Sequence, residues 1–283
     1  MRCLITIYAW LLARLPESFA RLNAWILGWV IWFLRGSLIK RNLREAFPQR
    51  DSAWIRRIGK LSCQRTAEMG LYAIASPLLA ETEIKQRISI HPSIFEGESA
   101  IPNNRPVVLF VPHFSLMEMM TAIKFIGPTL ADREWVTLYR PLDLAAAEVW
   151  VKESRERFGM KLVSRREGFG QVMRAVREGG IGCILFDQKT SSGTDIEFLG
   201  HPCSVTDLPG IIAQRFKSSN RVFWAERIGF WQCQLRTDAL KSVDSMGLTL
   251  ESNAWLAQRL SSSDDACADW LWAHDRWRHS QKN

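Results

Sequence analysis

Five histidines and six cysteines are few for a chain of 283 residues, and the cysteines lie far apart in the sequence. None of them forms a C-x-x-C pair, so their spacing supports neither a zinc site nor a disulfide scaffold, and we expect reduced, mostly buried thiols. The serine-hydrolase motif G-x-S-x-G and the nucleotide-binding motifs G-x-x-x-x-G-K-[ST] and G-x-G-x-x-G are also missing. The sequence therefore predicts no bound metal and no cofactor.

Long apolar runs are missing too, because no stretch reaches the roughly 18 apolar residues expected of a spanning helix. With a mean hydropathy of −0.09, this excludes a polytopic membrane protein. Tyrosine is scarce at 3 residues, whereas tryptophan reaches 13, and the formal net charge is +8. Tryptophan favours membrane interfaces, and the scattered Lys and Arg match no nucleic-acid-binding motif. We therefore expect contact with an anionic membrane surface and no nucleic acid.

The first fifty residues carry much of this signal, with two apolar stretches, Leu4–Leu12 and Ala24–Leu34, separated by Arg14 and Pro16. Both are short, which predicts two short amphipathic helices lying in the interface, with the alternative of a helical hairpin. A cleaved signal peptide is disfavoured because Arg14 and Pro16 break the apolar region and apolar sequence resumes at once. Residues 1–50 are thus predicted to be a membrane-associating element, and residues 51–283 a single domain.

The remainder alternates between short apolar runs and helical patterns. A long helix is expected from Asp51, its N-cap, to the stop at Pro77. The expected strands are Val107–Val111, Trp135–Tyr139, Lys161–Val163, Ile181–Phe186 and Arg221–Glu226. The expected helices are Ser115–Ile126, Leu144–Phe158, Phe169–Arg177, Leu208–Lys217 and a last one ending in Trp270–Trp277. This alternation predicts an α/β fold with a mostly parallel central sheet flanked by helices.

The most informative segment is VVLFVPHFSLMEMM, in which an apolar strand ends at Pro112 and His113 follows at once. Glu118 comes five residues after His113, so the two can meet only if His113 lies in the turn before a helix. A carboxylate on one imidazole nitrogen would fix the tautomer and leave the other nitrogen as a general base. The structural alternative is a capping box formed by Ser115 and Glu118.

H-x4-D/E after an apolar strand is the hallmark of the glycerolipid acyltransferase superfamily, and the version with Glu118 resembles the late (secondary) acyltransferases of lipid A biosynthesis. Four further matches follow in the order of that family: Asn42-Leu43 with Phe47-Pro48, Tyr139-Arg140-Pro141, Asp187-Gln188 with Phe198-Leu199-Gly200 and Thr206, and Trp272-x-His274-x-x-Trp277 with Arg276. The sequence departs from the family where Asp207-Leu208-Pro209-Gly210 replaces a Gly-Pro soon after the threonine.

The resemblance implies acyl transfer from acyl carrier protein to a hydroxyl of a lipid A precursor, at the cytoplasmic face of the inner membrane of a Gram-negative bacterium. It implies catalytic roles for His113 as base and Glu118 as its orienting carboxylate, without an acyl-enzyme. Arg140, Asp187 and Gln188 would bind substrate. From the residues alone, Arg140 equally fits a surface salt bridge, and Asp187 a loop cap.

Two alternatives stay open at this point: an acyltransferase for another membrane lipid or glycolipid, and a non-catalytic membrane-binding homologue. Cys183 and Cys203 are weaker candidates for a nucleophile, because the strand around Cys183 predicts burial. His274 is expected to be a packed structural residue, and His201 a turn residue. The sequence does not specify the acyl chain length, the acceptor hydroxyl or the oligomeric state.

Overall fold

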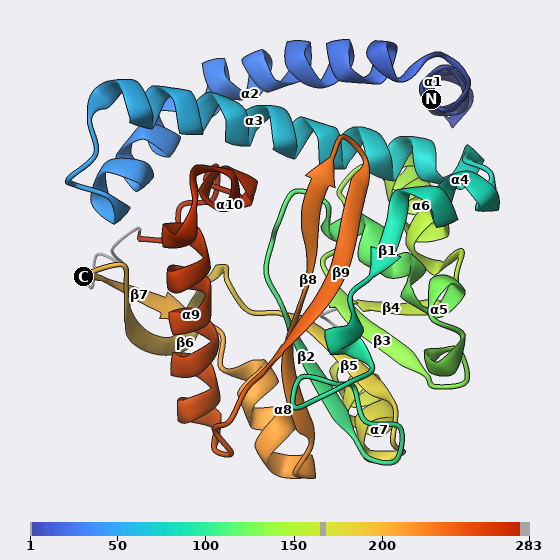
Figure 1. Cartoon of the computed structure of the whole chain (residues 1–283), viewed down its shortest axis with the longest axis vertical. Coiled ribbons are helices and arrows are strands. Elements are labelled where there is room, and N and C mark those ends of the chain that lie inside the picture. The colour runs from blue at the N-terminus through green and yellow to red at the C-terminus, as the bar shows by residue number, and fades with distance from the viewer. Residues whose placement is uncertain (1, 165–167, 278–283) are drawn as a thin grey trace.

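The computed structural model describes residues 2–164 and 168–277. Three helices begin the chain: α1 (Arg2–Arg14), α2 (Glu17–Ala46) and α3 (Ser52–Ala75). The Asp51 carboxylate accepts from the backbone N–H of Trp54 at 2.7 Å, so the expected N-cap of α3 is confirmed. Figure 1 shows α2 and α3 side by side across one end of the molecule.

The expectation of two short N-terminal helices is wrong for the second of them. α2 continues through the basic stretch after Leu34 and reaches 30 residues, and it is the one described helix long and apolar enough to cross a membrane. It continues because its inner face, which includes Gly28 and Ile39, packs on α3 beyond the apolar stretch. The expected division of the chain near residue 50 falls in the loop between these two helices and stays a prediction.

A seven-stranded sheet forms the centre, with strand order β1-β9-β8-β2-β5-β3-β4. Its strands are β1 (Ile88–Ile90), β2 (Val107–Val111), β3 (Trp135–Tyr139), β4 (Met160–Ser164), β5 (Ile181–Leu185), β8 (Ser219–Gly229) and β9 (Gln232–Ala239). Only the β8–β9 pair is antiparallel among the described pairs of this sheet, so the mostly parallel α/β fold is confirmed. A separate antiparallel pair consists of β6 (Lys189–Phe198) and β7 (His201–Val205).

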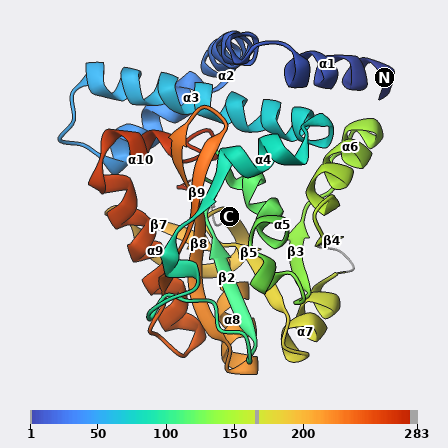
Figure 2. The same cartoon turned by 45° about the vertical axis from the view of Figure 1, so that its right-hand side comes forward.

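Strand β2 is buried along its whole length because helices cover both faces of the sheet. Val108 and Phe110 pack toward α7 (Phe169–Arg177), α8 (Leu208–Phe216) and α9 (Ser245–Ser262). Val107, Leu109 and Val111 pack toward the other layer. That layer contains α4 (Glu81–Arg87), the 3-10 helix η3 (Met117–Ala122), α5 (Ile123–Ile126) and α6 (Ala145–Glu156), and Figure 2 shows it from the side. The remaining short helices are η1 (Ser76–Leu78), η2 (Pro92–Ile94), η4 (Pro128–Leu130) and α10 (Asp264–Asp269).

Two expected helices differ from the structure. The one expected from Ser115 begins as the 3-10 helix η3 and becomes α-helical only in α5. Its capping box does not form, because the Ser115 hydroxyl donates to Asp269 at 2.9 Å instead. The last helix, α10, ends at Asp269, so residues 270–277 are not helical.

We call residues 270–277 the C-terminal strap. Its indole rings pack on one another inside the core, and both α2 and α3 hold its backbone. The Asn42 amide donates to the carbonyls of Trp272 at 3.0 Å and His274 at 2.8 Å, and Ser62 donates to that of Trp270 at 2.7 Å. These bonds tie the C-terminal strap to the helices at the other end of the sequence.

Candidate active site

His113 lies just beyond the carboxyl end of β2, and Asp187 lies just beyond that of β5. The two strands are parallel neighbours, with Val111 opposite Leu185, so the sheet itself brings the two side chains together. His113 Nδ1 lies 2.5 Å from Asp187 Oδ1, and the His113 backbone N–H donates to Asp187 Oδ2 at 2.8 Å. We call these residues the His113–Asp187 pair.

Asp187 is a fully buried carboxylate that stays ionised. Burial raises its pKa, but the charge and hydrogen bonds of His113, together with a hydrogen bond from Trp270, outweigh burial and lower the pKa to about 2. An ionised Asp187 only accepts hydrogen bonds, so Nδ1 of the neutral imidazole carries the proton. Nε2 is then the basic nitrogen, and no protein group among the described residues is hydrogen-bonded to it.

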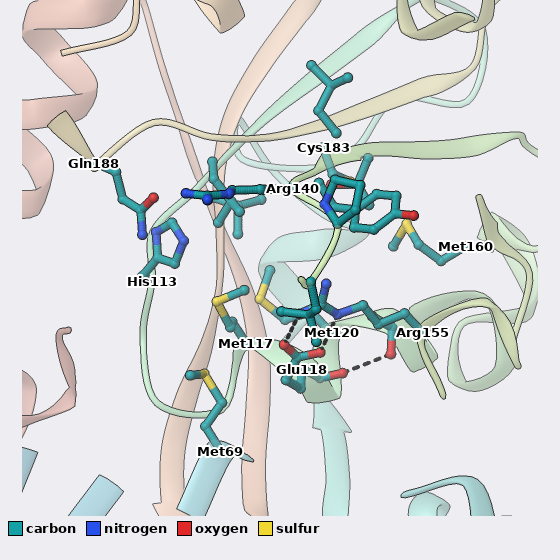
Figure 3. Close-up of a pocket in the computed structure, with 18 of the residues that line it drawn as sticks. Met69, His113, Met117, Glu118, Met120, Arg140, Arg155, Met160, Cys183 and Gln188 are labelled. Atoms are coloured by element: carbon teal, nitrogen blue, oxygen red, sulfur yellow. Dashed lines mark hydrogen bonds and ion pairs between the residues drawn. The ribbon is translucent and has the colours of Figure 1, made fainter. Parts of the chain in front are cut away.

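The expectation that Glu118 orients His113 is not met, because Asp187 occupies that place. Both oxygens of Glu118 are held by Arg155, whose Nε donates at 2.8 Å and Nη2 at 2.5 Å. The physical reason lies in η3, which begins only at Met117 and turns the Glu118 side chain toward α6 and away from His113 (Figure 3). Glu118 nevertheless lines the same cavity as His113.

A cavity of about 730 Å³ extends from His113 over the face of the sheet, beneath η3. Four of its lining residues are methionines: Met69, Met117, Met120 and Met160. Methionine side chains are flexible and apolar, so such a wall adapts to a long and irregular apolar ligand. The volume is that of a typical small-molecule site.

The sequence-predicted residues Arg140 and Gln188 both line this cavity. In Figure 3 the guanidinium of Arg140 extends toward His113 and Gln188. The loop after β3 that carries Arg140 is fixed by Glu148, which accepts from the Tyr139 hydroxyl at 2.6 Å and the Leu142 N–H at 2.7 Å. The cavity therefore has polar groups near His113, a methionine-rich wall, and the Glu118–Arg155 ion pair farther from His113.

The sequence profile of the family described as bacterial lipid A biosynthesis acyltransferases matches residues 1–279. The chain belongs to this family. The match spans the N-terminal helices, the sheet, the cavity and the C-terminal strap, and it supports acyltransferase activity in lipid A biosynthesis. A search of the curated proteins found no match.

Three residues at the site of this acyltransferase escaped sequence analysis: Arg155, Trp270 and Met69. Each comes from an element distant in sequence from His113, and no local pattern marks it. Arg155 could have been found only by asking which cation neutralises a buried Glu118. The sequence pattern predicts a helix around Trp270, whereas α10 ends at Asp269 and Trp270 lies in the C-terminal strap.

Two other candidates are unsuited to proton abstraction or nucleophilic attack in this acyltransferase. Burial lowers the pKa of His274, and its Nε2 already accepts the Lys189 N–H at 2.9 Å, which agrees with its expected structural role. Burial raises the pKa of the Cys183 thiol, which therefore stays protonated at neutral pH. Among residues 2–164 and 168–277, no cluster of His, Cys, Asp and Glu side chains has the makeup of a metal site.

Proposed function

We propose that the protein transfers a fatty acyl chain from acyl carrier protein to a hydroxyl of a lipid A precursor, with His113 as general base. The observation that carries this proposal is the His113–Asp187 pair, which leaves Nε2 of the imidazole free at one end of a cavity with a methionine-rich wall. The methionine-lined part of the cavity suits the acyl chain, and the end near His113 suits the reacting groups.

The proposed reaction needs no covalent enzyme intermediate, because a thioester already carries a good leaving group. His113 Nε2 takes the proton of the acceptor hydroxyl while the hydroxyl oxygen attacks the carbonyl carbon of the thioester. The tetrahedral intermediate then collapses and the C–S bond breaks. The released thiolate of the acyl carrier protein takes the proton from the imidazolium of His113. Arg140 and Gln188 lie near His113 and are placed to bind the carbonyl oxygen or a phosphate of the acceptor.

The direct test incubates purified protein with labelled acyl carrier protein and a lipid A precursor. We expect labelled lipid product, and no labelled protein after denaturation when the acceptor is omitted. A stable acyl-protein adduct would contradict direct attack. Lipid A mass spectra from cells with and without the gene then identify the acceptor, and an unchanged spectrum with a changed phospholipid or glycolipid would redirect the proposal to that lipid.

Glu118 is assigned a positioning role, holding Arg155 in the cavity wall. Glu118→Gln is expected to lower the rate by about ten- to hundredfold, because it leaves an arginine charge uncompensated in a largely buried place. Folding stability should fall for the same reason, by less than the roughly 3–5 kcal/mol of a fully buried pair, because the Arg155 side chain is 23% exposed. Steady-state kinetics and chemical denaturation check both effects.

The matched control for Glu118 is Glu134→Gln, which breaks the surface ion pair with Lys161 and should change folding stability by less than about 1 kcal/mol. A loss in Glu118→Gln as large as that in His113→Ala would contradict the positioning role. It would instead give Glu118 a direct part in proton transfer.

Arg140→Ala is expected to raise KM for a phosphorylated acceptor by about tenfold, because a charge-assisted hydrogen bond is lost. Arg140→Lys should recover only part of this loss, since lysine lacks the planar fork. Arg177→Ala, which removes an exposed arginine on α7, provides the control. Unchanged kinetics in Arg140→Ala would leave Arg140 as a surface residue.

The membrane-facing surface is proposed to be the exposed side of α1 and α2. Phe33 is 88% exposed, Leu34 68%, Trp10 54% and Trp25 52%. The opposite side of α2 packs on α3, where Gly28 lies against the backbone of Gln64. Because α3 accompanies α2 and carries charged residues, we propose that α2 lies in the interface at the cytoplasmic face of the inner membrane rather than crossing it.

Replacing Trp25, Phe33 and Leu34 together by serine is expected to move the protein from the membrane fraction to the soluble one. Burial of each such side chain contributes about 1.5–3 kcal/mol, and salt does not screen this contribution. Fractionation with and without high salt measures the effect. The control replaces Ile228, Val243 and Leu250, which are also exposed but lie outside α1 and α2. If only the control variant moves to the soluble fraction, the membrane-binding surface lies outside α1 and α2.

A further inference from the structure

The indole of Trp270 reaches the His113–Asp187 pair from the C-terminal strap. Its Nε1 donates to Asp187 Oδ2 at 2.7 Å, and the residue is only 2% exposed. The same oxygen accepts the His113 backbone N–H at 2.8 Å, which leaves Oδ1 for His113 Nδ1 at 2.5 Å. The two oxygens of Asp187 thus have separate and defined donors.

Trp270 is itself rigidly held, so its N–H points in one direction. Its backbone forms a β-bridge with Phe114, the residue that follows His113, and its carbonyl accepts the Ser62 hydroxyl at 2.7 Å. The ring packs edge-on against Trp272, with centroids 4.8 Å apart and planes at 89°. One residue therefore contacts both sides of the pair, the loop after β2 and the carboxylate after β5.

A buried carboxylate needs such a donor for two physical reasons. The last side-chain torsion angle of an aspartate has a broad distribution, so hydrogen bonds decide which carboxylate oxygen faces the imidazole. Burial also favours the protonated acid, and each added hydrogen bond to the anion opposes that tendency. A fixed third donor acts on both the orientation and the ionisation of Asp187.

We propose that Trp270 is a positioning residue for acyl transfer: its N–H fixes the Asp187 carboxylate so that His113 presents Nε2 to the acceptor hydroxyl. The proposal rests on the function assigned to His113 above. The proposal applies to Trp270 and not to Trp272 or Trp277, the other tryptophans of the C-terminal strap, because their indole N–H groups donate to backbone carbonyls.

The chain offers a matched control in Trp272. Its Nε1 also donates a 2.7 Å hydrogen bond, to the Cys267 carbonyl, and the residue is fully buried in the same C-terminal strap. Trp272→Phe removes an equal bond and an equal ring without touching Asp187. Any effect shared by Trp270→Phe and Trp272→Phe therefore reports packing alone.

Trp270→Phe is expected to lower kcat by about tenfold with KM unchanged, since one hydrogen bond to a charged group is lost. The acid limb of the pH–rate profile should move to higher pH, because an Asp187 with one donor fewer binds protonated His113 more tightly. In Trp272→Phe, the acid limb of the pH–rate profile should stay at the same pH as in the wild type. The other charged or titratable groups around the pair are His274, Arg276, Arg140, Lys189 and the Glu118–Arg155 ion pair, and neither variant replaces any of them. The Arg276 guanidinium lies 5.6 Å from the centre of the Trp270 ring, a contact that an isosteric ring at position 270 preserves.

Equal kcat and equal pH profiles in the two variants would overturn the proposal. If Trp270→Phe unfolds, replacing Trp270 by 3-benzothienylalanine keeps the ring shape and removes only the N–H, and the same shift is expected. The Nδ1 proton resonance of His113, identified by its loss in His113→Ala, gives a readout independent of turnover. It should move in Trp270→Phe and stay in Trp272→Phe. If both leave it unmoved, the positioning role is wrong, whereas normal turnover by His113→Ala would refute the proposed function itself.

Discussion

His113→Ala should still fold, though with lower stability because buried Asp187 loses its partner, and lose acyl transfer by about 10²–10⁴-fold in kcat, the range supplied by a positioned general base. The loss is expected in kcat rather than KM, because the imidazole acts on the proton that moves in the transition state. Folding should survive because His113 is not part of the apolar core on either side of β2, and the Trp270 indole still donates a hydrogen bond to Asp187. Single-turnover kinetics with acyl carrier protein and the lipid acceptor measure the effect directly.

The control for this variant is His201→Ala, which removes an imidazole that bonds to the Glu45 carbonyl and lies outside the cavity. We expect its turnover to stay near that of the wild type. Near-normal turnover by pure His113→Ala protein would reject the general-base mechanism and leave the cavity as a binding site only.

Asp187→Asn is expected to lower kcat by about 10³–10⁴-fold, nearly as much as the equivalent change lowers it in the triad of serine proteases. The reason follows from the donors around the side chain. The Oδ2 position receives N–H groups from His113 and Trp270, so the amide oxygen of asparagine must occupy it. The amide NH₂ then faces His113 Nδ1 and forces the proton onto Nε2, where the base is needed.

The control is Glu68→Gln, a buried carboxylate that binds Arg227 and the backbone of Trp231 and does not line the cavity. It should lower folding stability and leave kcat nearly unchanged. A similar kcat for Asp187→Asn and Glu68→Gln would show that Asp187 only supports the fold.

Asp187 also predicts a pH dependence of stability. Its pKa is lowered from the usual 3.8 to about 2, so the ion stabilises the folded state above pH 3.8, and this contribution is lost as the pH falls toward 2. The lowering corresponds to about 2 kcal/mol. Comparing wild type with Asp187→Asn by denaturation between pH 5 and pH 2 should show the difference shrinking as the pH falls. A constant difference would contradict the lowered pKa.

Much of the sheet could be predicted from short apolar runs because its central strands are buried on both faces. β2 and β3 have the expected boundaries, as does helix α7. Strand β9, which the sequence did not predict, alternates buried and more exposed residues, so it lacks the continuous apolar run of the central strands. It follows β8 through a tight turn, and antiparallel pairing with β8 makes it a strand. The length of α2 was missed for a similar reason, since packing on α3 sustains it beyond its apolar stretch.

The fold brings together several residues that the sequence selects, but the sequence did not predict which of them pair, and their catalytic and binding roles stay predictions. His113, Arg140, Asp187 and Gln188 were each selected from sequence, and each lies at the His113 end of the cavity or beside it. Spacing along the chain favoured Glu118 as the partner of His113. The actual partner is 74 residues away and is brought there by parallel strand pairing, which local spacing does not encode.

The dependence of the His113–Asp187 pair on the C-terminal strap has a consequence for protein synthesis. The helices proposed to meet the membrane leave the ribosome before Trp270 and Arg276, which hold the side chain and the carbonyl of Asp187. A nascent chain can therefore reach the lipid surface before its pair is assembled. Acyl transfer becomes possible only after residue 277 has emerged and folded back between α2 and α9, so a chain truncated before the strap should be targeted but inert.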